Sequence, residues 1–224
     1  MPEPFTKEEL PVELSWNFLG AWPDFLIPWG SQDPDATKPV DDGLWVYRRP
    51  MAADASEFAV GFEVLPNLVG DFEITLDYRD FKSKAVATDW KIPRIDFSGV
   101  VFAADDDFSP MHVLGIAHRR QVDDSLKATA TQGKKGPDGN QRWAFKQVVV
   151  SRDSGRLRLV RQKTWMFYQT APPASEDWIT IGTWQIDPGV FRSVGFGLRS
   201  EDLQGNGEAV LMKLNIRANA TKSR

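Results

Sequence analysis

Most of this chain alternates between apolar and polar residues with a period of two, and that alternation limits the fold more than any other feature. In 57–65 the apolar side chains of one face are Phe58, Val60, Phe62 and Val64. In 72–78 they are Phe72, Ile74, Leu76 and Tyr78. Successive side chains of a β-strand point to opposite faces of a sheet, so both segments are predicted to be half-buried strands.

The same pattern continues to the end of the chain. Further strands are predicted at 94–104, 112–121, 125–132, 142–151, 156–162, 165–170, 178–186, 193–200 and 208–218. Gly, Pro, Asn and Asp clusters, such as 136–140 and 205–207, separate most of them and predict turns. About a dozen short strands indicate an all-β, antiparallel two-sheet sandwich or a barrel.

The 224 residues fit a single domain, because such β folds run to roughly 200–250 residues as one unit. We expect an N-terminal arm over 1–50, the sandwich over 51–218 and a tail over 219–224. The arm is predicted to be irregular, since 11–50 is rich in proline and tryptophan and alternates weakly. Its aromatic side chains either anchor it to the sandwich or form one wall of a ligand cleft. The sole helix expected is a short one at 6–10, where Thr6 and Glu9 form a capping-box pattern.

Composition excludes several classes of function. The chain has no cysteine, which excludes a disulfide scaffold, a thiolate nucleophile and a zinc ribbon. A net charge of −4 argues against a nucleic-acid partner. No window of about 18 apolar residues is available to insert into a membrane. The N-terminus lacks a signal-peptide pattern, so we expect a cytoplasmic protein, or an extracytoplasmic one if a leader has been removed. The oligomeric state stays open.

Several segments resemble, in order, the strands of concanavalin A-like jelly rolls. They are GDFEITLDY at 70–78, GRLRLVRQ at 155–162, WMFY at 165–168, WITIGT at 178–183, VGFGL at 194–198 and VLMKLNIR at 210–217. The chain looks most like an uncharacterised bacterial branch of this superfamily, a domain of unknown function, and the likeness covers 57–218. The resemblance implies a jelly roll of two curved sheets, in which the concave sheet of many relatives binds saccharides.

Nine tryptophans interleaved with Arg and Asp suit a saccharide ligand, because flat aromatic rings cover the apolar face of a sugar while polar groups bind its hydroxyls. The candidate contacts are Trp90, Trp143, Trp165, Asp77, Arg79, Arg161, His112 and His118. Several have structural alternatives. The two histidines, about 20 Å apart on one strand, suit separate structural hydrogen bonds. Arg161 shares the face of the core leucines, so it is expected either in an ion pair with Asp77 or Glu73 or in the ligand groove.

A catalytic reading depends on paired carboxylates. Catalytic branches of the superfamily use Glu-x-Asp-x-Glu or Glu-x-Asp-x-x-Glu, and this chain has neither motif. The nearest approach is Glu73 and Asp77, whose Cα atoms are roughly 13 Å apart along a strand, too far for one glycosidic bond. Glu63, on another strand, can approach either of them, so these three residues form the alternative catalytic set, with Asp96 and Asp105 as further candidates.

No cofactor is expected, apart from calcium as a weak alternative. Asp-rich runs occupy 33–37 and 105–109, and Asp105 and Asp107 are the residues suited to a hard cation. Acidic residues also favour turns for local hydrogen bonding. The sequence therefore favours a non-catalytic module that binds a carbohydrate. A divergent glycoside hydrolase or lyase and a protein-interaction jelly roll are the alternatives.

Overall fold

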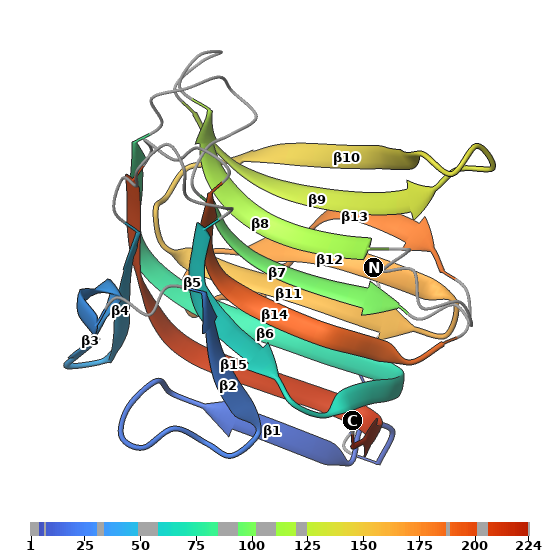
Figure 1. Ribbon diagram of the computed structural model, residues 1–224, viewed down its shortest axis with the longest axis horizontal. Helices are drawn as coiled ribbons and strands as arrows, with labels where there is room; N and C mark the ends of the chain where they lie inside the picture. The colour runs from blue at the N-terminus through green and yellow to red at the C-terminus, as the bar shows by residue number, and fades with distance from the viewer. Residues whose placement is uncertain are drawn as a thin grey trace.

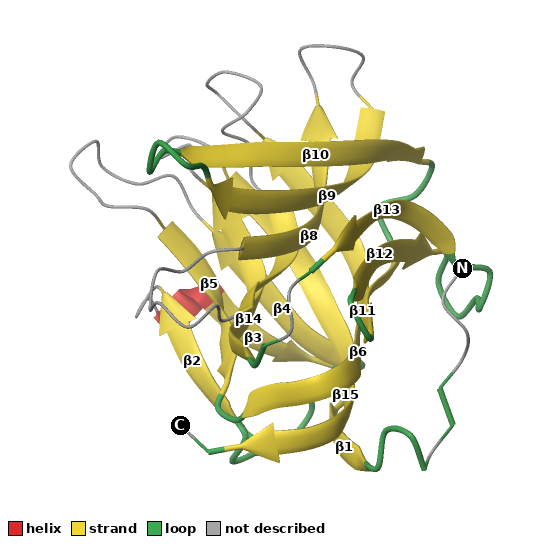
Figure 2. Ribbon diagram, turned by 90° about the vertical axis from the view of Figure 1, so that its right-hand side faces the viewer, coloured by secondary structure: helices red, strands yellow, loops and turns green. Residues whose placement is uncertain are grey.

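The structure, a computed structural model, describes residues 5–6, 8–30, 34–48, 58–84, 94–101, 111–119, 125–186, 189–200 and 206–223. Within these ranges the chain is almost entirely β-strand, with one short 3-10 helix, η1 (Pro34–Ala36), and no α-helix. The strands lie in two antiparallel layers packed face to face (Figures 1 and 2). Of the sandwich and the barrel that the alternation left open, the structure is the two-sheet sandwich, which the family resemblance implied. None of the described helical structure is long and apolar enough to cross a membrane.

The first sheet has seven strands. In spatial order they are β10 (Gln141–Val150), β9 (Ser125–Lys135), β8 (Met111–Arg119), β7 (Arg94–Val101), β14 (Phe191–Ser200), β5 (Phe58–Val64) and β2 (Leu26–Gly30). β10 pairs with β9 alone among the described strands, so it forms one edge of this sheet (Figure 1).

The second sheet is built around two long strands. In spatial order it contains β13 (Ile179–Gln185), β12 (Trp165–Ala171), β11 (Gly155–Gln162), β6 (Asn67–Lys84) and β15 (Asn206–Lys222). The other side of β15 pairs with β1 (Val12–Trp16) along one stretch and with β4 (Gly43–Arg48) along another, and β3 (Thr37–Val40) pairs with β4. A single pair, Phe191 with Leu68, links β14 to β6 where the layers meet.

The core lies between the sheets and follows the predicted alternation. The four residues of β6 that the sequence pattern indicated are all buried, and Leu68 and Phe81 of the same strand join them in the core. Leu157 and Leu159 of β11 pack beside them, and Leu114 and Ile116 of β8 face them from the first sheet. The strands predicted at 142–151, 156–162 and 178–186 match β10, β11 and β13 to within one residue at each end.

The N-terminal part is more regular than the sequence predicted. The segment expected to be an irregular arm contains four short strands, β1 to β4, which pair with β15, β5 and each other. The expected helix is wrong. Thr6 and Glu9 do form the reciprocal side-chain hydrogen bonds of a capping box, and the Leu10 amide donates to the Thr6 carbonyl. The chain makes only this one turn because Pro11 follows, and a proline disfavours helical geometry in the residue before it.

Candidate functional site

His112, a predicted ligand contact, lies inside the sandwich. Its side chain is 0% exposed, and its Nδ1 is hydrogen-bonded to the hydroxyl of Tyr168, which reaches across from β12. Burial, with a smaller contribution from Lys134 and Arg161, lowers the pKa of His112 to about 3. The imidazole is therefore neutral and joins the two sheets, which is the structural alternative considered for this residue.

Arg161 also lies inside, at the end of β11. Its guanidinium donates hydrogen bonds to the backbone carbonyls of Gly189 and Lys163. Burial lowers the pKa of Arg161 below its ordinary value. The expected ion pair with Asp77 or Glu73 does not form, because those carboxylates point to the other face of the sheet and bind other arginines. Arg161 holds two loops together.

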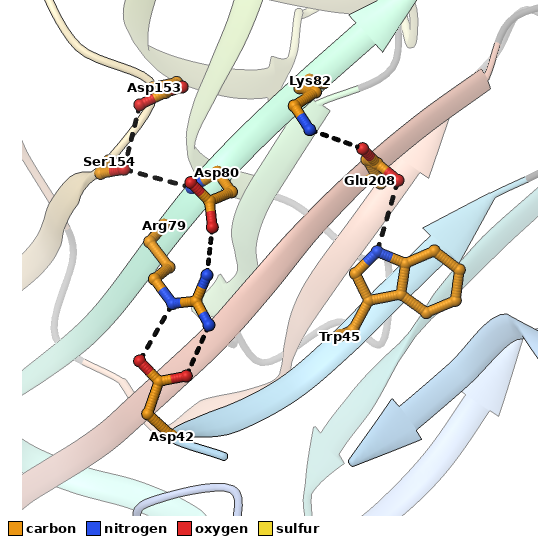
Figure 3. A network of polar contacts seen from close by, with 8 residues as sticks. All are labelled: Asp42, Trp45, Arg79, Asp80, Lys82, Asp153, Ser154 and Glu208. Atoms are coloured by element: carbon orange, nitrogen blue, oxygen red, sulfur yellow. Dashed lines mark hydrogen bonds and ion pairs between the residues drawn. The ribbon is translucent and has the colours of Figure 1, made fainter. Parts of the chain in front are cut away.

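Arg79, another predicted contact, is held in a network of ion pairs at the end of β6. Its guanidinium donates to both oxygens of Asp42 and also to Asp80, as Figure 3 shows. Hydrogen bonding to Asp42 raises the pKa of Arg79, and the same bonds lower the pKa of Asp42. Nearby, Glu208 accepts from Lys82 and from the indole of Trp45 (Figure 3). These contacts tie β6, β15 and β4 together at the surface.

The outer face of the second sheet carries two of the carboxylates proposed as catalytic. Asp77 accepts from Arg156 Nε at 2.9 Å, and Glu73 accepts from Arg158 Nη2 at 2.6 Å. Both carboxylates are partly buried. Each is thus paired with a guanidinium of the neighbouring strand β11.

Glu63 belongs to the opposite side of the molecule. Its neighbours Phe62 and Val64 on β5 face the core, so Glu63 faces outward from the first sheet. Glu63 and the Glu73–Asp77 pair are therefore separated by the thickness of two packed sheets, about 10 Å between their backbones. The three residues of the alternative catalytic set are not brought together around one bond.

The outer face of the first sheet carries an exposed apolar row on its edge strand. On β10 the side chains of Trp143, Phe145 and Val149 are 52%, 63% and 66% exposed. Odd-numbered positions share one face of a strand, so the three residues form a stripe. Phe145 pairs in register with Thr131 of β9, which faces out because its neighbour Ala130 is buried in the core.

The indole of Trp143 lies over Gly133 of the neighbouring strand. Gly133 is the register partner of Trp143 on β9, and a β-carbon at Gly133 would lie 2.5 Å from the Trp143 ring. Because glycine has no side chain, the indole can occupy this space. Trp143 nevertheless remains 52% exposed to solvent.

Hydroxyl and amide groups stand beside the aromatic stripe. Gln147 of β10 donates from Nε2 to the hydroxyl of Thr129 on β9 at 3.2 Å. Along this row Thr129 pairs with Gly115 of β8, and further across the sheet Gly197 of β14 pairs with Gly61 of β5. Gly115, Gly197 and Gly61 add no side chains to this row, and the aromatic and polar groups of β10 and β9 lie at one end of it.

β7 runs through the centre of this face. Asp96 occupies the register position between Gly115 and Gly197. Arg94, Asp96 and Ser98 occupy alternate positions of this strand.

The exposed tryptophans among the described residues do not gather in one groove. Trp143 lies on the first sheet, whereas Trp165, 46% exposed, begins β12 of the second sheet. Trp22, 45% exposed, packs its ring 4.6 Å from that of Phe62. Trp143 alone of these three rests on a glycine of a sheet face.

Five predicted residues are not characterised by the structure. Trp90, Asp105 and Asp107 lie outside the described residues, as do the side chains of Asp96 on β7 and His118 on β8. Among the residues that are described, no group of three or more His, Cys, Asp or Glu side chains is placed to hold a metal ion.

Comparison with known proteins identifies the family. A family model with the description "Protein of unknown function (DUF1583) C domain" matches residues 6–223. The chain belongs to this DUF1583 C-domain family. No curated protein sequence matches it.

Solved structures share the fold of this DUF1583 C domain at low sequence identity. A glycoside hydrolase family 16 endo-glucanase from Bacteroides ovatus is 8% identical, with a TM-score of 0.62, and the match covers 91% of this chain and 99% of that one. The CBM2 module of an evolved Dit protein from Lactobacillus casei BL23 phage J-1 is 8% identical, with a TM-score of 0.58 and coverage of 92% and 95%. A legume lectin-like domain from Entamoeba histolytica is 10% identical, with a TM-score of 0.51 and coverage of 86% and 89%. The DUF1583 C domain therefore has the concanavalin A-like jelly-roll fold that its strands resemble.

The sequence analysis did not name several residues that lie next to the predicted ones in the structure. Phe145 lies two positions after Trp143, so the period of two already placed it on the same face. Arg156, Arg158 and Trp178 form a second cluster, in which each guanidinium carbon lies about 5 Å from the indole centroid, at 4.9 and 5.0 Å respectively. The alternation of Arg with Leu in 156–159 marked an outward basic face, but the partner Trp178 is apparent only after folding.

Proposed function

We propose that this DUF1583 C domain binds a glycan on the outer face of its first sheet, with Trp143 and Phe145 stacking on sugar rings. The observation that carries the proposal is the Trp143 ring, which lies against Gly133 of the neighbouring strand while the residue remains 52% exposed to solvent. A fixed, flat aromatic ring offers a large apolar contact at little entropic cost. Thr129, Thr131 and Gln147 supply hydrogen-bonding groups for sugar hydroxyls in the adjacent rows.

Binding without hydrolysis is the form of this function that we favour. Glu73 and Asp77 are paired with arginines on the second sheet, and Glu63 faces out from the first. Hydrolysis needs two carboxylates within about 5–9.5 Å on either side of one bond. The carbohydrate class is supported by the endo-glucanase and the CBM2 module that share the fold.

Affinity electrophoresis in gels containing a soluble β-glucan, a xylan or a mannan tests the proposal. We expect retardation by at least one polymer and loss of about tenfold or more in affinity in Trp143→Ala, because a buried aromatic anchor contributes on the order of 2 kcal/mol to binding. Trp165→Ala is the matched control, since that tryptophan is similarly exposed on the other sheet.

Two results would contradict the proposal. One is the absence of retardation by every polymer; the other is equal weakening by the Trp143 and Trp165 substitutions. Release of reducing ends from a retained polymer would show that the hydrolase alternative is correct.

A further inference from the structure

A polar pocket lies on the outer face of the second sheet, on the far side of the sandwich from Trp143. Its volume is about 180 Å³. That is well above the roughly 10–15 Å³ that one buried water needs, so the pocket has room for a small molecule. Thr75 of β6 and Asn215 of β15, which pair in register, lie at its centre.

Trp178 and Arg156 form one wall of this pocket. The Trp178 indole donates to Glu176, and Arg156 donates to Glu176 and Asp77. The Arg156 guanidinium also lies against the indole ring. These contacts hold the wall in place without a ligand, so binding there costs little ordering of side chains.

The charges of the pocket leave two cations without an anionic partner. Each lining carboxylate contacts a guanidinium: Glu73 binds Arg158, and both Asp77 and Glu176 bind Arg156. Lys213 and Arg217 also line the pocket, two positions before and two positions after Asn215 on β15. No carboxylate in the described part of the chain forms an ion pair with either, although Arg217 donates to the Thr6 carbonyl. The four cations Arg156, Arg158, Lys213 and Arg217 stand against three carboxylates, because Arg156 binds two of them, so one anionic group would neutralise the pocket.

The floor of the pocket also contains an unpaired polar atom. Asn215 Oδ1 is buried and has no hydrogen-bond partner. Buried polar atoms are almost always hydrogen-bonded, to protein, water or ligand. A hydroxyl group both donates and accepts, so it satisfies the end of an amide side chain in either orientation.

We propose that this pocket binds one acidic sugar unit, with Lys213 and Arg217 facing its carboxylate and Asn215 bonded to a hydroxyl. The ligand class follows from the two requirements together: an anion for the cations and a hydroxyl for the amide. This site is independent of glycan binding at Trp143, because the two lie on opposite faces of the sandwich.

NMR titration of the protein with D-glucuronate tests this assignment. We expect a saturable shift of the Trp178 indole resonance and about tenfold weaker binding in Lys213→Met, because the charge that faces the carboxylate is removed. Lys222→Met, which removes a lysine of the same strand outside the pocket, should bind as the wild type does. D-glucose has the hydroxyl groups without the carboxylate, and acetate has the carboxylate without the hydroxyl groups. Each should therefore bind at least about tenfold more weakly than glucuronate.

The proposal is overturned if glucuronate leaves the Trp178 resonance unchanged or if Lys213→Met binds it as tightly as Lys222→Met does. Equal affinity for acetate and glucuronate would also overturn it, because the pocket would then recognise an anion without a sugar. Trp143→Ala leaves all of these results unchanged, which distinguishes failure of this site from failure of the site on the first sheet.

Discussion

Lowering the pH tests how His112 joins the two sheets. The side chain is fully buried, and burial holds its pKa at about 3 in the folded protein. The ordinary pKa of histidine, about 6.5, applies to the unfolded chain. Between these two values the unfolded chain binds a proton that the folded protein does not, so stability falls as the pH falls. Well above pH 6.5 the histidine is neutral in both the folded and the unfolded protein. Well below pH 3 it is protonated in both, and the total loss in the free energy of unfolding is then about 5 kcal/mol.

The substitution His112→Asn should abolish this contribution. Over the accessible range from pH 7.5 to pH 5, the histidine contributes a loss of about 2 kcal/mol in the free energy of unfolding. Asparagine places a polar atom near the position of Nδ1 but does not titrate. The smaller side chain also costs stability, by an amount that is the same at both pH values. We therefore compare the change in the free energy of unfolding between the two pH values, measured with urea, in the wild type and in the variant. Because the carboxylates contribute equally to both proteins, the difference gives the contribution of His112 protonation.

Tyr168→Phe is the control for the cause of the effect. It removes the hydroxyl that contacts His112 Nδ1 and leaves the imidazole buried. Because burial is the main cause of the lowered pKa, this variant should keep the wild-type dependence on pH. An unchanged slope in His112→Asn, or an imidazole NMR titration of His112 with a midpoint near pH 6.5, would refute the reasoning.

Three further predictions concern stability and are read from urea unfolding at pH 7. Gly61→Ala should lose about 1–3 kcal/mol of stability, because the new β-carbon would lie 2.3 Å from the Phe196 carbonyl oxygen. An unchanged stability would mean that β5 and β14 move apart easily to make room for it. Leu159→Ala should lose about 2–5 kcal/mol from the core, and a loss under 1 kcal/mol would show that the core collapses around the gap. Arg156→Met should lose about 1–3 kcal/mol of stability, because it breaks a partly buried ion pair. Arg142→Met breaks a more exposed ion pair and should lose under about 0.5 kcal/mol. Equal losses in the two variants would contradict this ranking.

The fold was predictable because the same alternation of apolar and polar residues repeats in most of its strands. Each strand must bury one face, so a period of two in 72–78 or 156–162 identifies the strand and its core residues without knowledge of its neighbours. The short N-terminal strands were not predictable in this way. β2 and β3 each contain a proline, and they are strands because β5 and β4 offer edges to pair with.

The candidate site was only partly predictable. Trp143 was named from its residue type, but its place over Gly133 depends on a neighbouring strand in a register set by the turn at 136–140. Arg79 and Arg161 were named as ligand contacts because they are charged near core strands. The folded chain engages Arg79 with Asp42 and Asp80, and Arg161 with loop carbonyls, all contributed by other segments.

The sequence by itself determined that the chain is an all-β fold of antiparallel strands, a sandwich or a barrel, and which face of its regular strands is buried, because hydrophobic alternation is a local property of the chain. The tertiary structure alone decided which outward residues share a surface. It placed Glu63 on one side of the molecule and Glu73 and Asp77 on the other, and it put Trp178 over two arginines from β11. Sheet order and register bring together residues far apart in sequence, and no local pattern encodes those pairings.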